Sequence, residues 1–164
     1  MSKYATFLRG IGPGNPNMRQ EKLKWFFEKL GFMNVKAVIS SGNVIFESRS
    51  KNIPALESKI ETGLPKYLGF KSMTIVVSQQ DLEKLIKQNP FKGRVHNTHS
   101  YLLVTFFKNK PAKKLKYDRA ICNIYNLSGN KGPEIMANLE KQYGKQITSR
   151  TWKTVNRIVE KFKE

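Results

Sequence analysis

Apolar and polar residues follow strand and helix periods in turn along the first half of the chain. Residues 3–9 alternate and include Tyr4, Phe7 and Leu8, which predicts a strand that ends at the glycine- and proline-rich segment 10–16. Leucine and phenylalanine then recur at i, i+3, i+4 and i+7, which predicts a helix that Asn17 caps and Gly31 ends. The apolar positions of this helix are Leu23, Phe26, Phe27 and Leu30.

A predicted hairpin and a second helix complete the pattern of the first half. Two short runs of β-branched and aromatic residues, 35–39 and 44–46, flank a Ser-Ser-Gly-Asn turn. A helix follows, which we expect Gly63 and Pro65 to bend or end. Its apolar positions are Leu56, Ile60 and Leu64, and a strand at 74–77 comes next. The order β, α, β, β, α, β predicts a ferredoxin-like subdomain over residues 1–78.

The second half, residues 79–164, also mixes helices and strands. Ser78 caps a predicted helix that carries Leu82, Leu85 and Ile86. The remaining predicted elements are strands at 101–107 and 120–127 and helices at 134–143 and 151–162. The expected fold is therefore α+β, with a ferredoxin-like βαββαβ first half packed against a second, basic α+β half that ends in an amphipathic helix.

The face of the predicted first sheet bears on function, because ferredoxin-like units include RNA-binding modules that stack bases on exposed strands. The segment Asn43-Val44-Ile45-Phe46-Glu47 lacks their basic-Gly-aromatic-Gly pattern. We expect the apolar face of this sheet to be covered by the second half of the chain rather than exposed to bases. If Ala5 and Phe7 face the helices, alternation places Arg9 on the same side.

Charge is the one unusual feature of the composition. The chain has 30 Lys and Arg against 12 Asp and Glu, a formal net charge of +18, which favours polyanionic partners such as nucleic acid. Two groups of cations are candidates for phosphate contacts, with Tyr117 as a stacking group beside the first. They are Lys108, Lys110, Lys113, Lys114, Lys116 and Arg119, and the helical stripe of Arg150, Lys153, Arg157 and Lys161. The alternative is ordinary solvated surface charge.

The segment Gly10-Ile11-Gly12-Pro13-Gly14 lies between a strand and a helix, where backbone N–H groups can hold an anion. Its spacing is not that of a nucleotide-binding loop, and Pro13 and Pro16 each remove an N–H group, so a structural turn is favoured. For Arg9, an internal ion pair or a clamp on backbone carbonyls is favoured over capture of a ligand.

The sequence contains no recognisable set of catalytic residues. The single cysteine, Cys122, lies in an apolar stretch and is expected to be a core residue. The only histidines, His96 and His99, lie in a polar segment without further ligands, so no metal or cofactor is expected. No Ser-His-Asp triad or acid pair can be placed, and we do not expect an enzyme. Without a secretory signal or a long apolar run, we expect a cytoplasmic protein with no membrane partner.

Three ordered motifs span nearly the whole chain, and together they resemble those of a widespread bacterial family of domains of unknown function. They are Phe7-Leu8-Arg9-Gly10-Ile11, Ser41-Gly42-Asn43-Val44-Ile45-Phe46 and Arg150-Thr151-Trp152-Lys153-Thr154-Val155. The resemblance implies the fold just described and no activity. Where the family usually has Asn-Val-Gly-Gly, this chain has Gly12-Pro13-Gly14-Asn15, and Thr151 replaces the usual Asn, so an intact shared ligand loop does not follow.

Three hypotheses result. The first is a non-catalytic binding module for an anionic partner, nucleic acid or a phosphate-bearing ligand, that uses the two cation groups. The second is a small-molecule or nucleotide pocket, with enzymatic activity, built from the motif residues. Its candidates are Arg9, Gly10, Gly12, Asn15, Ser41, Asn43, Arg150, Trp152 and Thr154. The third is structural: the motifs hold the two halves together, Arg150 caps carbonyls and Trp152 packs in the core.

Overall fold

The computed structural model describes residues 1–10, 14–39, 42–129 and 131–164, which form two compact units. The first unit comprises Met1–Leu82 and Arg157–Glu164, and the second comprises Glu83–Asn156. The divisions fall inside helices α3 (Gln79–Gln88) and α5 (Trp152–Phe162). The end of the chain therefore groups with the first unit, where Lys3 Nζ donates to Phe162 O at 3.2 Å and Lys36 Nζ donates to Glu164 O at 2.7 Å.

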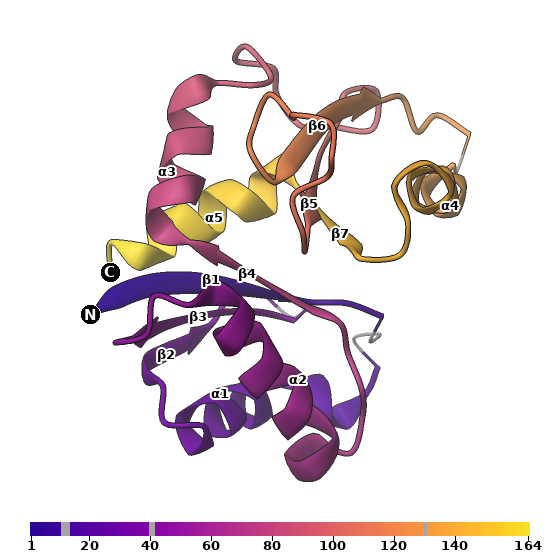
Figure 1. Ribbon diagram of the computed structural model, residues 1–164. Coiled ribbons are helices and arrows are strands. Elements are labelled where there is room, and N and C mark those ends of the chain that lie inside the picture. The colour runs from indigo at the N-terminus through magenta and orange to yellow at the C-terminus, as the bar shows by residue number, and fades with distance from the viewer. Residues whose placement is uncertain (11–13, 40–41, 130) are drawn as a thin grey trace. The chain divides into compact units, whose positions relative to one another are not determined.

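The first unit contains one antiparallel sheet and two long helices. Its strands are β1 (Ser2–Leu8), β2 (Met33–Ala37), β3 (Asn43–Ser48) and β4 (Thr74–Ser78), in the order β2-β3-β1-β4. A short 3-10 turn η1 (Pro16–Met18) precedes α1 (Gln20–Lys29), and α2 (Ile53–Leu68) connects β3 to β4 (Figure 1). The α+β fold class is confirmed, and this strand order is consistent with the predicted ferredoxin-like arrangement.

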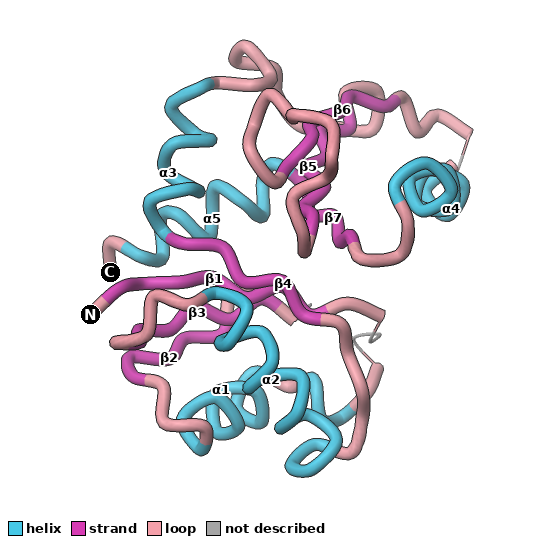
Figure 2. The backbone as a smooth tube through the Cα atoms, in the orientation of Figure 1, coloured by secondary structure: helices cyan, strands magenta, loops and turns pink. Residues whose placement is uncertain are grey.

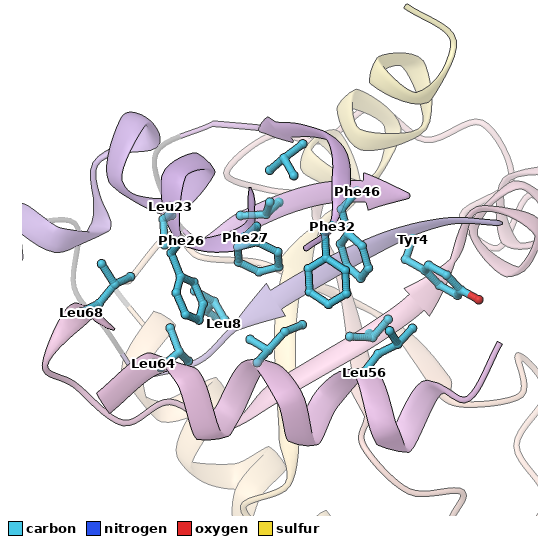
Figure 3. Packing of buried hydrophobic residues seen from close by; sticks show 14 of the residues in the cluster. Tyr4, Leu8, Leu23, Phe26, Phe27, Phe32, Phe46, Leu56, Leu64 and Leu68 are labelled. Atoms are coloured by element: carbon cyan, nitrogen blue, oxygen red, sulfur yellow. The ribbon is translucent and has the colours of Figure 1, made fainter. Parts of the chain in front are cut away.

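Both helices pack on one face of this sheet, as the buried aromatic rings in Figure 3 show. Tyr4 and Leu8 of β1 lie in this core, and the ring of Phe46 lies 4.3 Å from that of Phe32 and 5.7 Å from that of Phe27, centroid to centroid. The condition under which alternation would place Arg9 on the helix side, that Ala5 and Phe7 face the helices, is therefore not met. All five residues from 4 to 8 are buried, because both faces of the strand are covered. Burial therefore does not alternate along β1, and the sequence pattern cannot show which residues face the helices.

The opposite face of the sheet is also buried. Ala5, Phe7 and Ile45 project there and are at most 4% exposed. Within the first unit, the end of α5 lies on this side, because Phe162 lines a small cavity of about 50 Å³ together with Lys3 and Ile45. The described strands of this sheet therefore offer no open apolar face on which bases could stack.

Helix α2 continues through Gly63 and Pro65, so these residues do not end it; that they bend it stays a prediction. It ends at Gly69, whose φ of +76° closes the last turn. A Cβ at Gly63 would lie 3.0 Å from side-chain atoms of Leu30 and of Phe26, so this glycine permits the close approach of α1. The packed apolar face of α2 outweighs the single hydrogen bond that Pro65 removes.

The cap of the first helix also differs from the prediction. The side chain of Asn15 caps η1 by accepting from the N–H group of Asn17 at 2.9 Å. Asn17 is not the N-cap of α1; its side-chain amide donates to the carbonyl of Leu68 at the end of α2, at 2.8 Å. Asn17 thus satisfies a helix C-terminus rather than an N-terminus.

Helix α2 also covers the backbone edge of β4, an edge strand of the sheet. The buried carboxylate of Glu57 accepts the N–H group of Val76 at 2.9 Å, and Glu61, one turn later, accepts the N–H group of Thr74 at 3.2 Å. The spacing of residues i and i+4 along a helix is close to that of residues i and i+2 along a strand. The two acids therefore accept from two successive outward-pointing N–H groups of β4. The strand edge is thereby closed to further pairing.

Replacement of Glu57 by alanine should lower the free energy of unfolding by about 2 to 3 kcal/mol, since a buried N–H group loses its acceptor. Glu61→Ala is the matched control at the half-buried position one turn away, and it should cost about 1 kcal/mol or less. Urea denaturation of both variants at 25 °C checks this. Equal losses would contradict a special role for Glu57.

The second unit contains a three-stranded antiparallel sheet and α4 (Gly132–Tyr143), shown by secondary structure in Figure 2. The strands β5 (Tyr101–Phe107), β6 (Ala120–Tyr125) and β7 (Ile147–Thr151) lie in the order β6-β5-β7. Leu139 of α4 packs with Leu103, Phe107 and Ile147 on one face. Strand β7 was not predicted, because only one of its residues, Ile147, is a large apolar residue.

Candidate anion-binding surface

The connection between β5 and β6, residues 108–119, is a long loop rich in cations, and we call it the basic hairpin loop. Its base is fixed by hydrogen bonds. Phe107 N–H donates to Arg119 O at 2.8 Å, which closes the hairpin. Lys108 N–H donates to the backbone carbonyl of Gln146 at 3.0 Å, and the side-chain amide of Asn109 donates to the Gln146 side chain at 2.9 Å.

An apolar anchor holds the middle of the basic hairpin loop. Leu115 is half-buried and packs against the cluster that contains Phe107 and Ile147. Lys113, Lys114 and Lys116, on either side of this anchor, are exposed to solvent. Leu115 thus anchors the middle of the loop, and the three exposed lysines beside it lie close together in sequence.

Two cations of the loop, Lys110 and Lys116, lie beside internal partners. Lys110 Nζ lies 3.0 Å from Asp118 Oδ1, but both side chains are more than half exposed, and such a pair contributes about 1 kcal/mol or less. Lys116 Nζ lies 5.4 Å from the centroid of the Tyr117 ring. Tyr117 itself is half-buried, so the structure provides a cation beside this ring rather than a freely exposed stacking platform.

The charge is concentrated in the second unit. Its 74 residues contain 15 Lys and Arg and four Asp and Glu, whereas the first unit has 15 Lys and Arg and eight Asp and Glu. The net charges are thus +11 and +7. Opposing acids are scarce in the unit that carries the basic hairpin loop, so its cations are less neutralised internally.

The predicted helical stripe is shorter than expected. Lys153, Arg157 and Lys161 recur every four residues along α5, but Arg150 lies on β7. Arg150 Nη1 donates to Thr148 Oγ1 and to the carbonyl of Ser149, both at 2.8 Å, and burial lowers the pKa of Arg150 to about 10. These bonds include one of the carbonyl contacts that the structural hypothesis expected of Arg150.

The two predicted cation groups do not converge within the second unit. Lys153 follows Thr151, which pairs with Leu103 near the start of β5, whereas the basic hairpin loop follows Phe107 at the other end of that strand. Four residues of strand separate these ends, about 13 Å. The basic hairpin loop is therefore a candidate surface on its own.

Arg9 of the first motif is held against the residues that precede β4. The N–H group of Arg9 donates to Ser72 Oγ at 2.8 Å and to Met73 O at 3.1 Å, and Ser72 Oγ donates to Arg9 O at 2.6 Å. Burial lowers the pKa of the Arg9 guanidinium. Gly10 has a φ of +79°, which glycine adopts readily. Gly12 and Ser41 lie outside the described residues.

In the second motif, Gly42 and Asn43 contact β1. Gly42 has a φ of +71°, and a Cβ there would lie 3.0 Å from Leu8 Cβ. Its carbonyl accepts from the N–H group of Leu8 at 2.9 Å. Asn43 is 1% exposed and pairs with Phe7. Gly42 is therefore explained by backbone conformation and close packing, without a ligand.

The third motif ends β7 and begins α5. Thr151 Oγ1 accepts the N–H group of Thr154 at 3.2 Å and lies 3.1 Å from Thr154 Oγ1, the geometry of a helix N-cap. The Trp152 ring packs edge-on against Phe91, with centroids 5.2 Å apart. Sequence reasoning missed the cap, although a threonine just before an amphipathic run is its usual signal.

The motif residues of the pocket hypothesis belong to both units. Arg9, Gly10, Asn15 and Asn43 lie in the first unit, and Arg150, Trp152 and Thr154 lie in the second. The contacts described for these residues hold turns, caps and a strand end. A pocket formed by them stays a prediction.

The remaining candidates for chemistry make structural contacts. Burial raises the pKa of the Cys122 thiol to about 12, which keeps it protonated and a poor nucleophile. His96 Nδ1 accepts from the N–H group of Leu102 at 3.1 Å, and its ring lies 4.7 Å from that of Tyr101. Within the described part of the chain, no three His, Cys, Asp or Glu side chains gather as metal ligands would. The helices described there are also too short or too polar to cross a membrane.

The N-cap role of Thr151 can be tested by substitution. Thr151→Ala should lower the free energy of unfolding by about 1 kcal/mol, because the N–H group of Thr154 loses its acceptor. Thr151→Ser keeps the hydroxyl and should recover most of that loss, as measured by urea denaturation. A serine variant as unstable as the alanine variant would show that the methyl group, not the cap, matters.

Comparison with known proteins gives a family and a fold. The model of a family described as a protein of unknown function, DUF1697, matches residues 1–120. The structure of a conserved bacterial protein, SP0830 from Streptococcus pneumoniae, is similar with a TM-score of 0.75 and 22% sequence identity, covering 100% of this chain and 99% of that one. Among curated proteins, none matches the sequence.

Proposed function

Since this chain belongs to the DUF1697 family of proteins of unknown function, we propose a function from its own surface: it binds a polyanion, nucleic acid first, through the basic hairpin loop. The binding is non-catalytic and takes place in the cytoplasm. The observation that carries the proposal is the position of Lys113, Lys114 and Lys116, which are exposed on both sides of the anchored Leu115.

The physical basis is the release of counterions from the phosphate backbone. Each lysine that neutralises a phosphate frees a condensed cation, so affinity falls steeply as salt rises. The net charge of +11 on the second unit also attracts polyanions over distances of about 10 Å at 0.1 M salt. The loop has no array of exposed aromatic rings, so phosphate contacts rather than base stacking should dominate, with little sequence preference.

Binding of labelled single- and double-stranded oligonucleotides, followed by fluorescence anisotropy across a salt series, tests the proposal. The joint variant Lys113→Ala, Lys114→Ala and Lys116→Ala should bind duplex DNA about tenfold or more weakly at 0.1 M salt. The slope of log K against log salt should become shallower by about 2 to 3, because up to three phosphate contacts are lost.

The matched control removes three exposed lysines from α1 in the first unit, as Lys22→Ala, Lys24→Ala and Lys29→Ala. It lowers the net charge by the same amount but leaves the basic hairpin loop unchanged, so its slope should stay near that of the unmodified protein. If both variants lose affinity equally, the attraction is due to net charge and not to the loop. Absence of binding at about 50 mM salt would overturn the proposal, since phosphate contacts are strongest there.

A further inference from the structure

The two sheets of the described residues have four edge strands, and three of them are protected against pairing. The carboxylates of Glu57 and Glu61 cap β4. Strand β2 carries Lys36 and a register shift after Met33, and both features discourage a further strand. Strand β7 is five residues long and carries Arg150. Short, charged, bulged or covered edges are the usual means by which proteins avoid edge pairing.

The fourth edge, β6, carries no charged residue and no register shift, and no described strand pairs with its outer side. Residues Ala120–Tyr125 contain no charge, proline or glycine, and their register with β5 is unbroken from Phe106–Ala120 to Tyr101–Tyr125. The uncharged stretch continues to residue 130, in a chain with 30 Lys and Arg and 12 Asp and Glu. The side chain of Ile124 is 42% exposed on this strand. An uncharged, regular, apolar edge is a template for another strand.

The hydrogen bond at the hairpin base fixes which backbone groups of β6 face outward. Phe107 N–H donates to Arg119 O, which places these two residues at a hydrogen-bonded position of the ladder. Hydrogen-bonded pairs alternate in an antiparallel ladder, so Ile121, Asn123 and Tyr125 turn their backbone groups toward β5. Cys122 and Ile124 therefore turn their N–H and C=O groups away from β5, at the open edge.

We propose that β6 pairs with β6 of a second copy of this chain, antiparallel and about a two-fold axis, so that the two three-stranded sheets become one. In the pairing centred on Asn123, Cys122 faces Ile124 of the second copy and Ile124 faces its Cys122. Both are hydrogen-bonded pairs, and together they exchange four backbone bonds. The axis makes the contact self-complementary, as a closed dimer requires.

The side chains of β6 suit this pairing. On one face, Ile121 lies opposite Tyr125 of the second copy, an apolar and aromatic cross-strand pair, and the two Asn123 amides meet on the axis. On the other face, Cys122 lies opposite Ile124. No pair places like charges together, which is what a second copy of a +18 chain needs at its interface.

The same net charge sets the salt dependence of the dimer. Two copies of charge +18 repel, and added salt screens that repulsion while leaving the uncharged strand contact almost unchanged. Dimerisation should therefore strengthen as salt rises. This trend is opposite to that of polyanion binding, so the two processes are separable in one salt series.

Sedimentation equilibrium of the full chain tests the proposal, at about 50 mM and about 500 mM salt, which brackets strong and weak screening. We expect a monomer–dimer equilibrium that is tighter at high salt. Ile124→Lys places charges in the central pairs and should weaken dimerisation about tenfold or more. Cys122→Pro removes an outward N–H group without breaking the ladder to β5 and should do the same.

Val95→Lys is the matched control, because Val95 is 75% exposed in the same unit and lies outside β6. It adds the same charge and should leave the dimer unchanged, and thermal melting by circular dichroism shows whether each variant remains folded. Three results would overturn the proposal: a monomer at all concentrations in high salt, a dimer that both folded β6 variants leave intact, or equal weakening by Val95→Lys.

Discussion

The need to satisfy the outward-facing backbone groups of open sheets organises much of this structure. An antiparallel sheet that does not close into a barrel leaves two rows of N–H and C=O groups without strand partners. In the first unit, α2 meets this need at β4, where the buried carboxylate of Glu57 accepts the N–H group of Val76. The same helix fills the core through Leu56, Ile60 and Leu64, so one element both covers the sheet and closes its edge. In the second unit, no described strand pairs with the outer side of β6.

The second unit combines this open edge with the highest density of positive charge. The basic hairpin loop leads directly into β6, and Leu115 and the bonds to Gln146 fix its backbone. The positively charged loop and the uncharged strand edge are thus adjacent in sequence, but they suit different kinds of partner. The loop offers ammonium groups to phosphates, whereas β6 offers backbone bonds and uncharged side chains to another strand. Membership of the DUF1697 family supplies no activity, so the function is argued from these surfaces.

The sequence predicts the elements of this fold better than their contacts. A short apolar run places β5 at residues 101–107, as observed, and Ser78 caps α3 by accepting from Asp81 N–H at 3.1 Å. The faces of β1 could not be assigned, because a strand buried on both sides loses its alternation. The cap by Glu57 and the place of Arg150 on β7 depend on tertiary pairing, which leaves no local pattern. The basic hairpin loop is visible as a run of lysines, but its anchoring by Leu115 is not.

Native-state hydrogen exchange, followed by NMR residue by residue, tests most directly whether the edges differ as described. The N–H groups of Val76 and Ile124 both point outward from edge strands, and only Val76 is held by a buried carboxylate. In dilute protein, where β6 is unpaired, Val76 should exchange slowly, near the rate of global unfolding, and Ile124 should exchange orders of magnitude faster. Equal exchange rates at the two amides in dilute protein would contradict this account of the edges.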